Sequence, residues 1–127
     1  MAARTTIDEL LAAARAGLER LDPHQARAAI DDGALLLDIR SESQRAADGR
    51  VPGAIWFARN VLEWRCDPAS DARDERVSDL DRRLIVMCDE GYASSLAAAT
   101  LQQLGFARAT DLAGGFQAWR AAGLPVL

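Results

Sequence analysis

Cys88 is the residue of this sequence that is best placed for nucleophilic chemistry. It closes a short apolar run, residues 84–87, and residues 89–93 (DEGYA) lead from it into a helical pattern that Ser94 or Ser95 is expected to cap. The free backbone N–H groups in the first turn of a helix stabilise an anion, and the Cys88 thiolate can be that anion. The pattern predicts a reactive thiol. The alternative is a small buried strand residue, because free cysteines are often buried.

The residues after Cys88 limit the chemistry expected of this thiol. Asp89 and Glu90 follow it directly, and their negative charges oppose a thiolate. A phosphatase of the cysteine-x5-arginine type needs an arginine six positions after the nucleophile to bind the phosphoryl oxygens, and Ser94 holds that position. Phosphatase or arsenate reductase chemistry is therefore disfavoured, and another thiol chemistry is expected.

The remaining candidate reactive side chains are few. Cys66 is expected to be a buried bystander, with a role as a second thiol as the alternative. The one histidine, His24, lies in the first turn of a predicted helix and is not expected to act as a base. Two cysteines and one histidine are too few for a zinc site, so no metal is expected.

The composition excludes several classes of protein. Of the 127 residues, 50% are hydrophobic and 27% are charged, which is typical of one globular domain. The fifteen basic residues are all arginines and the net charge is −4, whereas a nucleic-acid-binding protein has a basic face. No apolar run reaches the ~20 residues of a membrane helix, and the N-terminus is not typical of a signal peptide. We therefore expect no nucleic-acid or membrane partner and a cytoplasmic location.

Helix and strand signals alternate along the chain. Three capping boxes predict helix starts: Thr6 with Glu9, Asp22 with Gln25, and Ser41 with Gln44. Four short apolar runs predict strands within residues 34–39, 51–57, 83–88 and 109–112. The first helix is expected over residues 7–20. This order predicts an α/β fold, with a small parallel β-sheet of about five strands flanked by helices on both faces.

Separated motifs of this chain resemble the rhodanese-like domain family, the sulfurtransferases. They occur in the family's order and are LLLDIRSESQRAADGRVPGA (residues 35–54), LIVMCDEGYASS (84–95) and DLAGGFQAWRAAGLPV (111–126). The likeness covers about residues 21–126. It divides the chain into an N-terminal helical extension, residues 1–20, and a rhodanese-like domain, residues 21–127.

The resemblance implies a sulfurtransferase that works through a persulfide. The Cys88 thiolate would take a sulfane sulfur from a small donor or a persulfide-carrying protein, and pass it to cyanide, a thiol or a protein acceptor. The resemblance implies no cofactor. Asp38 and Arg40 are similar to the family's pair that braces the active-site loop, and Tyr92 would form the pocket wall. The loop implied by the resemblance consists of Cys88, Asp89, Glu90, Gly91, Tyr92, Ala93 and Ser94.

The chain departs from the family's pattern at three places. Ala93 stands where the family's loop usually has an arginine, so thiosulfate is expected to be a poor donor. Arg50 stands where the family often has a histidine; it is a candidate cation at the rim of the site, with a solvated surface position as the alternative. The added first helix is expected to pack on the domain, with a homodimer or partner surface as the alternative. The alternative function is a rhodanese-like binding, sulfur-carrier or regulatory module without turnover.

Overall fold

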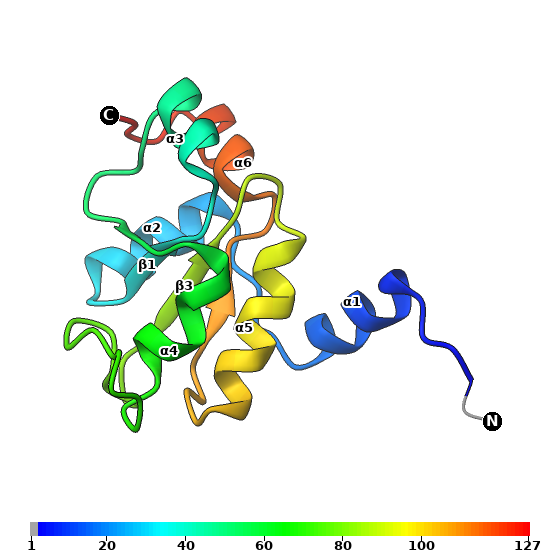
Figure 1. Ribbon diagram of the computed structural model, residues 1–127. Helices are drawn as coiled ribbons and strands as arrows, with labels where there is room; N and C mark the ends of the chain where they lie inside the picture. Colours follow the sequence, from blue (N-terminus) through cyan, green and yellow to red (C-terminus); the bar gives the residue numbers. More distant parts are fainter. Residues whose placement is uncertain (1–2) are drawn as a thin grey trace.

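A parallel four-stranded sheet forms the centre of the protein. The computed structural model describes residues 3–127, and in these residues the strand order is β2-β1-β3-β4 (Figure 1). The strands are β1 (Leu35–Asp38), β2 (Ile55–Trp56), β3 (Leu84–Met87) and β4 (Thr110–Asp111). Every neighbouring pair is parallel, and Asp38 lies opposite Met87 at the carboxyl ends of the two longer strands. Cys88 directly follows Met87, so it lies at this edge of the sheet.

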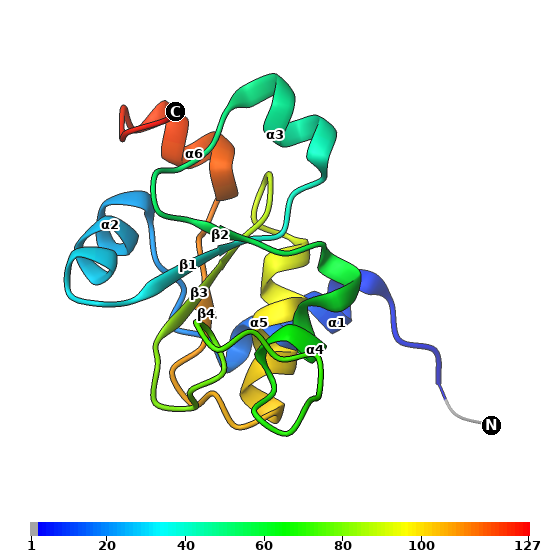
Figure 2. The same ribbon diagram turned by 60° about the vertical axis from the view of Figure 1, so that its left-hand side comes forward.

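Helices cover both faces of the sheet, which the all-apolar strands require. The helices are α1 (Ile7–Ala16), α2 (Pro23–Asp31), α3 (Glu42–Asp48), the 3₁₀ turn η1 (Arg59–Val61), α4 (Leu62–Cys66), α5 (Ala93–Gln103) and α6 (Gly115–Ala121). Ile85 and Met87 belong to the core beneath α2 and α6, whereas Leu84 and Val86 belong to the core beneath α4 and α5 (Figures 1 and 2). The predicted α/β class, with a parallel sheet between two helical layers, is confirmed.

The sheet has four strands in the described residues, where about five were predicted. Beyond β4 the chain forms only an isolated parallel bridge, between Leu21 and Leu112. The backbone N–H of Leu21 donates to the Asp111 carbonyl at 3.1 Å, and the backbone N–H of Ala113 donates to the Leu21 carbonyl at 2.8 Å. A single bridge is too short to form a fifth strand.

The three predicted capping boxes are all present, each with both of its hydrogen bonds. The first helix begins at Ile7 as predicted, but it ends at Ala16 and not at Arg20. The reason is that the following backbone binds to β4 instead of continuing the helix. Thr110 Oγ1, for example, donates to the Glu19 carbonyl at 2.8 Å.

Helix α1 stands at the side of the protein and contacts α5 (Figures 1 and 2). None of its residues is buried, and Ile7 and Leu10 are exposed. The expected packing on the domain is therefore present at α5, but it leaves much of the apolar stripe of α1 uncovered. The homodimer through this helix, and the division of the chain at residue 20, stay predictions.

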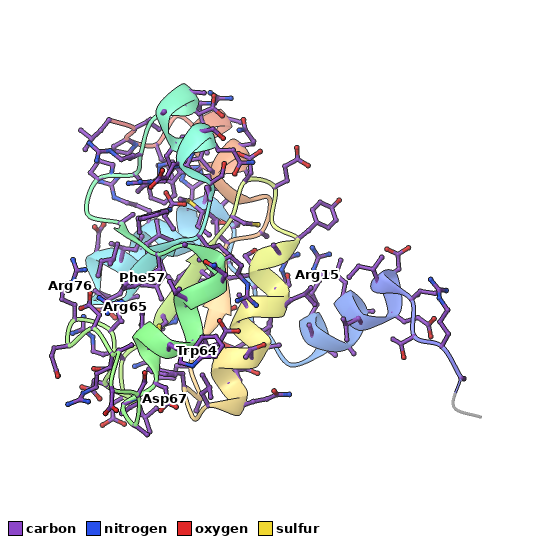
Figure 3. All side chains as sticks on the ribbon, in the orientation of Figure 1. Arg15, Phe57, Trp64, Arg65, Asp67 and Arg76 are labelled. Atoms are coloured by element: carbon purple, nitrogen blue, oxygen red, sulfur yellow. The ribbon has the colours of Figure 1, made fainter. Side chains whose placement is uncertain are left out.

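The polar connection between α4 and β3 folds into a series of turns. Arg65 and Arg76 lie close together in this region (Figure 3). Both approach Asp74, with N–O distances of 3.5 and 2.7 Å. The side-chain hydrogen bond from Arg76 lowers the pKa of Asp74 to about 2.

Within residues 3–127, none of the helices has both the length and the apolar character that crossing a bilayer requires.

Candidate active site

Two backbone amides contact the Cys88 sulfur. Its Sγ accepts hydrogen bonds from the backbone N–H of Gly91 at 3.1 Å and of Ser94 at 3.4 Å. Ser94 lies in the first turn of α5, so the predicted approach of a helix N-terminus to this sulfur is present. Cys88 is buried, with 8% of its surface exposed, so the expected position of a small residue in the core is present together with the amide contacts. Such amides stabilise a negative charge on sulfur, whether in a thiolate or in a persulfide.

Two glycines let the Cys88 loop, residues 88–93, pack closely against the start of α6. Gly91 has φ +87°, and a Cβ on it would lie 2.6 Å from the Gly114 nitrogen. Gly115 has φ +62°, and a Cβ on it would lie 2.6 Å from the Cys88 carbonyl oxygen. That carbonyl accepts a hydrogen bond from the backbone N–H of Phe116 at 2.9 Å. Gly91 and Gly115 therefore permit this close packing, and the Phe116 amide binds the first part of the loop.

The two acids of the loop point in different directions. Asp89 is half-buried, and its Oδ1 accepts a hydrogen bond from Gln117 Nε2 of α6 at 2.9 Å. Glu90 is exposed to solvent. Neither carboxylate makes a salt bridge within 4.0 Å to a cation of the described residues. No ion pair of the described residues therefore neutralises either negative charge.

Tyr92 and Ala93 lie on the outside of the loop. Tyr92 is 59% exposed, and the Arg15 guanidinium lies 5.3 Å from the centre of its ring. The structure therefore places Tyr92 at the surface of the loop, and its predicted position in a pocket wall stays a prediction. Ala93 is also exposed and begins α5.

Ser94 and Ser95 do not cap α5 with their side chains, contrary to the predicted cap. The N-cap of α5 is Tyr92, which makes no side-chain cap hydrogen bond. Both serine hydroxyls instead donate to Oδ2 of Asp111, at 2.8 and 2.7 Å. Asp111 lies at the end of β4 and is fully buried, so a buried carboxylate binds the first turn of α5 directly.

Two arginines before residue 21 reach the same site and were not predicted from the sequence. Arg15 Nη2 and Arg20 Nη2 both donate to the Gly91 carbonyl, at 2.7 and 2.8 Å. Arg20 also forms a salt bridge with Asp111, with Nε 2.9 Å from Oδ1. These partners lie 76, 71 and 91 residues away along the chain, so no local pattern connects them.

Asp38 and Arg40 form a buried ion pair, as the resemblance implies. Arg40 Nε and Nη2 donate to the two carboxylate oxygens of Asp38, at 3.1 and 2.9 Å. The Arg40 guanidinium also lies 3.8 Å from the centre of the Phe116 ring. Phe116 thus contacts both the Arg40 guanidinium and, through its backbone N–H, the Cys88 carbonyl. The bracing role of the ion pair stays a prediction.

Arg50 is exposed, and its backbone forms two hydrogen bonds with Leu127, at 3.2 and 2.7 Å. Its side chain makes no hydrogen bond or ion pair with the described part of the Cys88 loop, so a rim position stays a prediction. An open groove of about 650 Å³, lined in part by Ile39, Arg40 and Trp56, lies at the carboxyl end of β1. Ile39 follows β1 as Cys88 follows the paired strand β3, but no residue of the Cys88 loop lines this groove.

Cys66 is unsuited to nucleophilic chemistry. It is completely buried at the end of α4. Burial raises the pKa of its thiol to about 12, and the nearby carboxylates of Glu63 and Asp74 add to this increase. Both cysteines are free thiols. Over residues 3–127, no three His, Cys, Asp or Glu side chains come together in a way that could hold a metal ion.

Comparison with known proteins agrees with this geometry. Residues 22–122 match the family model of the rhodanese-like domain. The thiosulfate sulfurtransferase GlpE of Pseudomonas aeruginosa (strain LESB58) is 37% identical over 102 residues, which are 80% of this chain and 84% of that protein.

Among solved structures, a protein of unknown function from Rhodopseudomonas palustris CGA009, described as a possible tyrosine phosphatase, superposes with a TM-score of 0.89 and 31% identity. That match covers 100% of this chain and 98% of the other. The human single-domain sulfurtransferase superposes with a TM-score of 0.66 and 27% identity, over 80% of this chain and 95% of its own. The family expected from the motifs is confirmed: this chain belongs to the family of rhodanese-like domains.

Proposed function

We propose that this protein is a sulfurtransferase and that Cys88 carries the transferred sulfur as a persulfide. One observation carries the proposal: the Cys88 Sγ accepts two backbone hydrogen bonds, from Gly91 and Ser94, at the carboxyl edge of the sheet. The same amides suit both the thiolate and the terminal sulfur of a persulfide, because each carries a negative charge. The names of relatives such as GlpE support the same class of reaction.

The proposed cycle has two displacement steps and needs no metal or organic cofactor. The thiolate attacks the outer, sulfane sulfur of the donor; the S–S bond of the donor breaks, and the leaving group departs with the electron pair. Cys88 then carries a terminal S⁻. A nucleophilic acceptor, such as cyanide or a thiol, attacks this terminal sulfur, and the Cys88 thiolate is released. Each step is a displacement that transfers one sulfane sulfur atom, so no external oxidant or reductant is required.

Local charge favours donors other than thiosulfate. Asp89 and Glu90 each contribute a negative charge, Arg15 contributes a positive charge, and Arg20 is neutralised by its salt bridge with Asp111. The site is therefore net negative by about one charge, which repels a dianion by about 0.6–2.4 kcal/mol per unit charge at about 7 Å. We propose a neutral or cationic donor, or the persulfide of a partner protein. A thiosulfate rate that exceeds the rates with all other donors would contradict this part of the proposal.

The second candidate is a rhodanese-like module that binds a partner or carries sulfur without turnover. The acidic loop, which lacks an arginine at Ala93, favours this candidate. Intact-protein mass spectrometry separates the two. A sulfurtransferase gains one sulfur from a suitable donor, loses it on addition of cyanide, and shows neither change in Cys88→Ser. A module without turnover gains no sulfur from any donor, or does not release it to cyanide or to a thiol.

A separate assay, the release of phosphate from an aryl phosphate, addresses the phosphatase description given to the Rhodopseudomonas protein. Ser94, not an arginine, stands six residues after Cys88, and its hydroxyl is bound to buried Asp111. We therefore expect no release of phosphate from an aryl phosphate under conditions in which sulfur is transferred. We further propose a reducing, cytoplasmic setting for the protein, because the cycle needs Cys88 as a free thiol.

A further inference from the structure

We propose that Arg15 and Arg20, which precede the matched domain of residues 22–122, are positioning residues of the sulfur site. The inference rests on the proposed function, since it assigns these arginines to the loop that holds the Cys88 sulfur. According to this inference, the N-terminal segment contributes residues that position the active-site loop. Arg15 belongs to α1, and Arg20 to the link between α1 and α2.

The first observation is that both guanidinium groups bind one peptide oxygen of the loop. Arg15 and Arg20 donate to the Gly91 carbonyl at 2.7 and 2.8 Å, while the N–H of the same glycine donates to Cys88 Sγ at 3.1 Å. Figure 3 shows Arg15 on the side of α1 that faces α5. Gly91 has a positive φ, and because glycine has no Cβ its backbone can adopt other conformations unless its neighbours hold it. The two cations therefore fix the orientation of the residue whose amide touches the sulfur.

The second observation concerns Ser94, which supplies the other amide hydrogen bond to sulfur. Its hydroxyl donates to Asp111 Oδ2, and Asp111 is in turn bound by Arg20 through Nε at 2.9 Å and Nη2 at 3.2 Å. Arg15 Nε donates to the hydroxyl of Ser95, which also donates to Asp111. Both amides that contact the Cys88 sulfur thus belong to residues that the two arginines hold, directly or through one carboxylate.

The two arginines differ in charge balance, and this difference separates their roles. Arg20 is paired with the buried Asp111, so its charge is compensated. Within residues 3–127 no carboxylate lies within 4.0 Å of the Arg15 guanidinium, so its positive charge acts on the loop and on the sulfur. Arg15 should stabilise the thiolate and the persulfide by charge as well as by position. Arg20 should act through position alone.

The test compares Arg15→Met, Arg15→Lys and Arg20→Lys with Arg27→Met. Arginine, lysine and methionine have similar helix propensities, so α1 and α2 should keep their structure. Arg27 is a matched control, because its guanidinium pairs with the exposed Asp31 of α2, at 3.6 Å. Two quantities are measured in each variant. They are the pH at which the ultraviolet absorbance of the Cys88 thiolate appears, and the rate at which Cys88 gains sulfur from a low-molecular-weight persulfide donor at pH 7.

In Arg15→Met we expect the thiolate to appear about half a pH unit to one unit higher, and sulfur uptake to slow about three- to thirtyfold. Arg15→Lys keeps the charge but cannot bridge Gly91 and Ser95 with a planar fork. It should therefore restore the pH at which the thiolate absorbance appears, while sulfur uptake stays about threefold slower than in the natural protein. Arg20→Lys, which keeps the charge beside Asp111, should slow uptake without moving the thiolate pH. Arg27→Met should match the natural protein in both quantities.

The two readouts separate a failure of this inference from a failure of the proposed function. If the natural protein gains no sulfur but Arg15→Met still moves the thiolate pH, the proposed function is wrong and the positioning role stands. If the natural protein gains sulfur and Arg15→Met matches Arg27→Met in both quantities, the positioning role is overturned. If Arg15→Lys behaves like Arg15→Met in both quantities, the charge argument for Arg15 is overturned as well.

Discussion

Asp111 is the buried carboxylate that joins the N-terminal segment to the first turn of α5, and Asp111→Asn tests this arrangement. The natural side chain accepts hydrogen bonds from Arg20, Ser94 and Ser95. Asparagine has the same size, but only one of its two terminal atoms accepts hydrogen bonds. In either orientation of the amide, at least one of these donors faces an NH₂ group, and Arg20 loses its counter-charge.

The size of the effect follows from the burial of the pair. Removing one partner of a buried ion pair costs about 3–5 kcal/mol. Asp111 is fully buried, but the Arg20 side chain is 22% exposed, so water compensates part of the loss. We therefore expect the lower end of the range, about 3 kcal/mol. For a urea slope of about 2 kcal/mol/M, this loss lowers the unfolding midpoint by about 1.5 M and leaves the slope unchanged.

The assay is urea unfolding followed by circular dichroism, with Asp31→Asn as the matched control. Asp31 is 67% exposed and forms a helical i,i+4 pair with Arg27, so its replacement should change the free energy of unfolding by about 0.5 kcal/mol or less. A midpoint shift in Asp111→Asn that is no larger than the shift in Asp31→Asn would refute the assignment of Asp111 as a buried charged link.

Three further predictions concern the loop, the second thiol and the polar connection. Gly115→Ala should slow sulfur uptake by Cys88 more than tenfold, because the new Cβ would lie 2.6 Å from the Cys88 carbonyl oxygen. The control is Gly123→Ala, which also has a positive φ but has no atom within 4 Å of the new Cβ. This control should lose only about 1–2 kcal/mol of stability and keep its rate of sulfur uptake. Peptide mapping after alkylation at pH 8 should find the label on Cys88 and none on Cys66, because burial raises the pKa of Cys66 to about 12; equal labelling would contradict this. Because the Arg76 hydrogen bond lowers the pKa of Asp74 to about 2, the ionised Asp74 stabilises the fold above the ordinary pKa of 3.8 and loses this effect as the pH falls toward 2. The stability difference between the natural protein and Asp74→Asn should therefore be largest above about pH 5 and should close toward pH 2, whereas Asp71→Asn, at an exposed position of the same connection, should show no such trend.

Much of the fold could be predicted from the sequence, because local chemistry determines it. The capping box of Thr6 and Glu9 marks a helix start through hydrogen bonds between residues three positions apart. The apolar run before Cys88 becomes β3, since only a strand covered on both faces buries all four of its side chains. The approach of backbone amides to Cys88 was likewise expected from the strand, loop and helix order alone.

The parts that sequence reasoning missed depend on contacts between distant segments. Ser94 and Ser95 resemble helix caps locally, but the buried Asp111 provides a charged acceptor that replaces this role. Arg15 and Arg20 look like ordinary charged residues at the end of a surface helix, and only the fold brings them to Gly91. The absence of an arginine at Ala93 indicated that the loop lacks the family's usual cation. It did not indicate that Arg15 and Arg20 bring cations to the loop.

The most direct test of the account is a crystal structure of the protein after exposure to a sulfur donor without an acceptor. The account predicts density for one additional sulfur bonded to Cys88 Sγ, within hydrogen-bond distance of the loop amides, and none on Cys66. It also predicts that the N–H groups of Gly91 and Ser94 point toward the Cys88 sulfur and that Arg15 and Arg20 remain on the Gly91 carbonyl. Additional sulfur on Cys66, or amides of Gly91 and Ser94 turned away from an unmodified Cys88, would contradict the central claim.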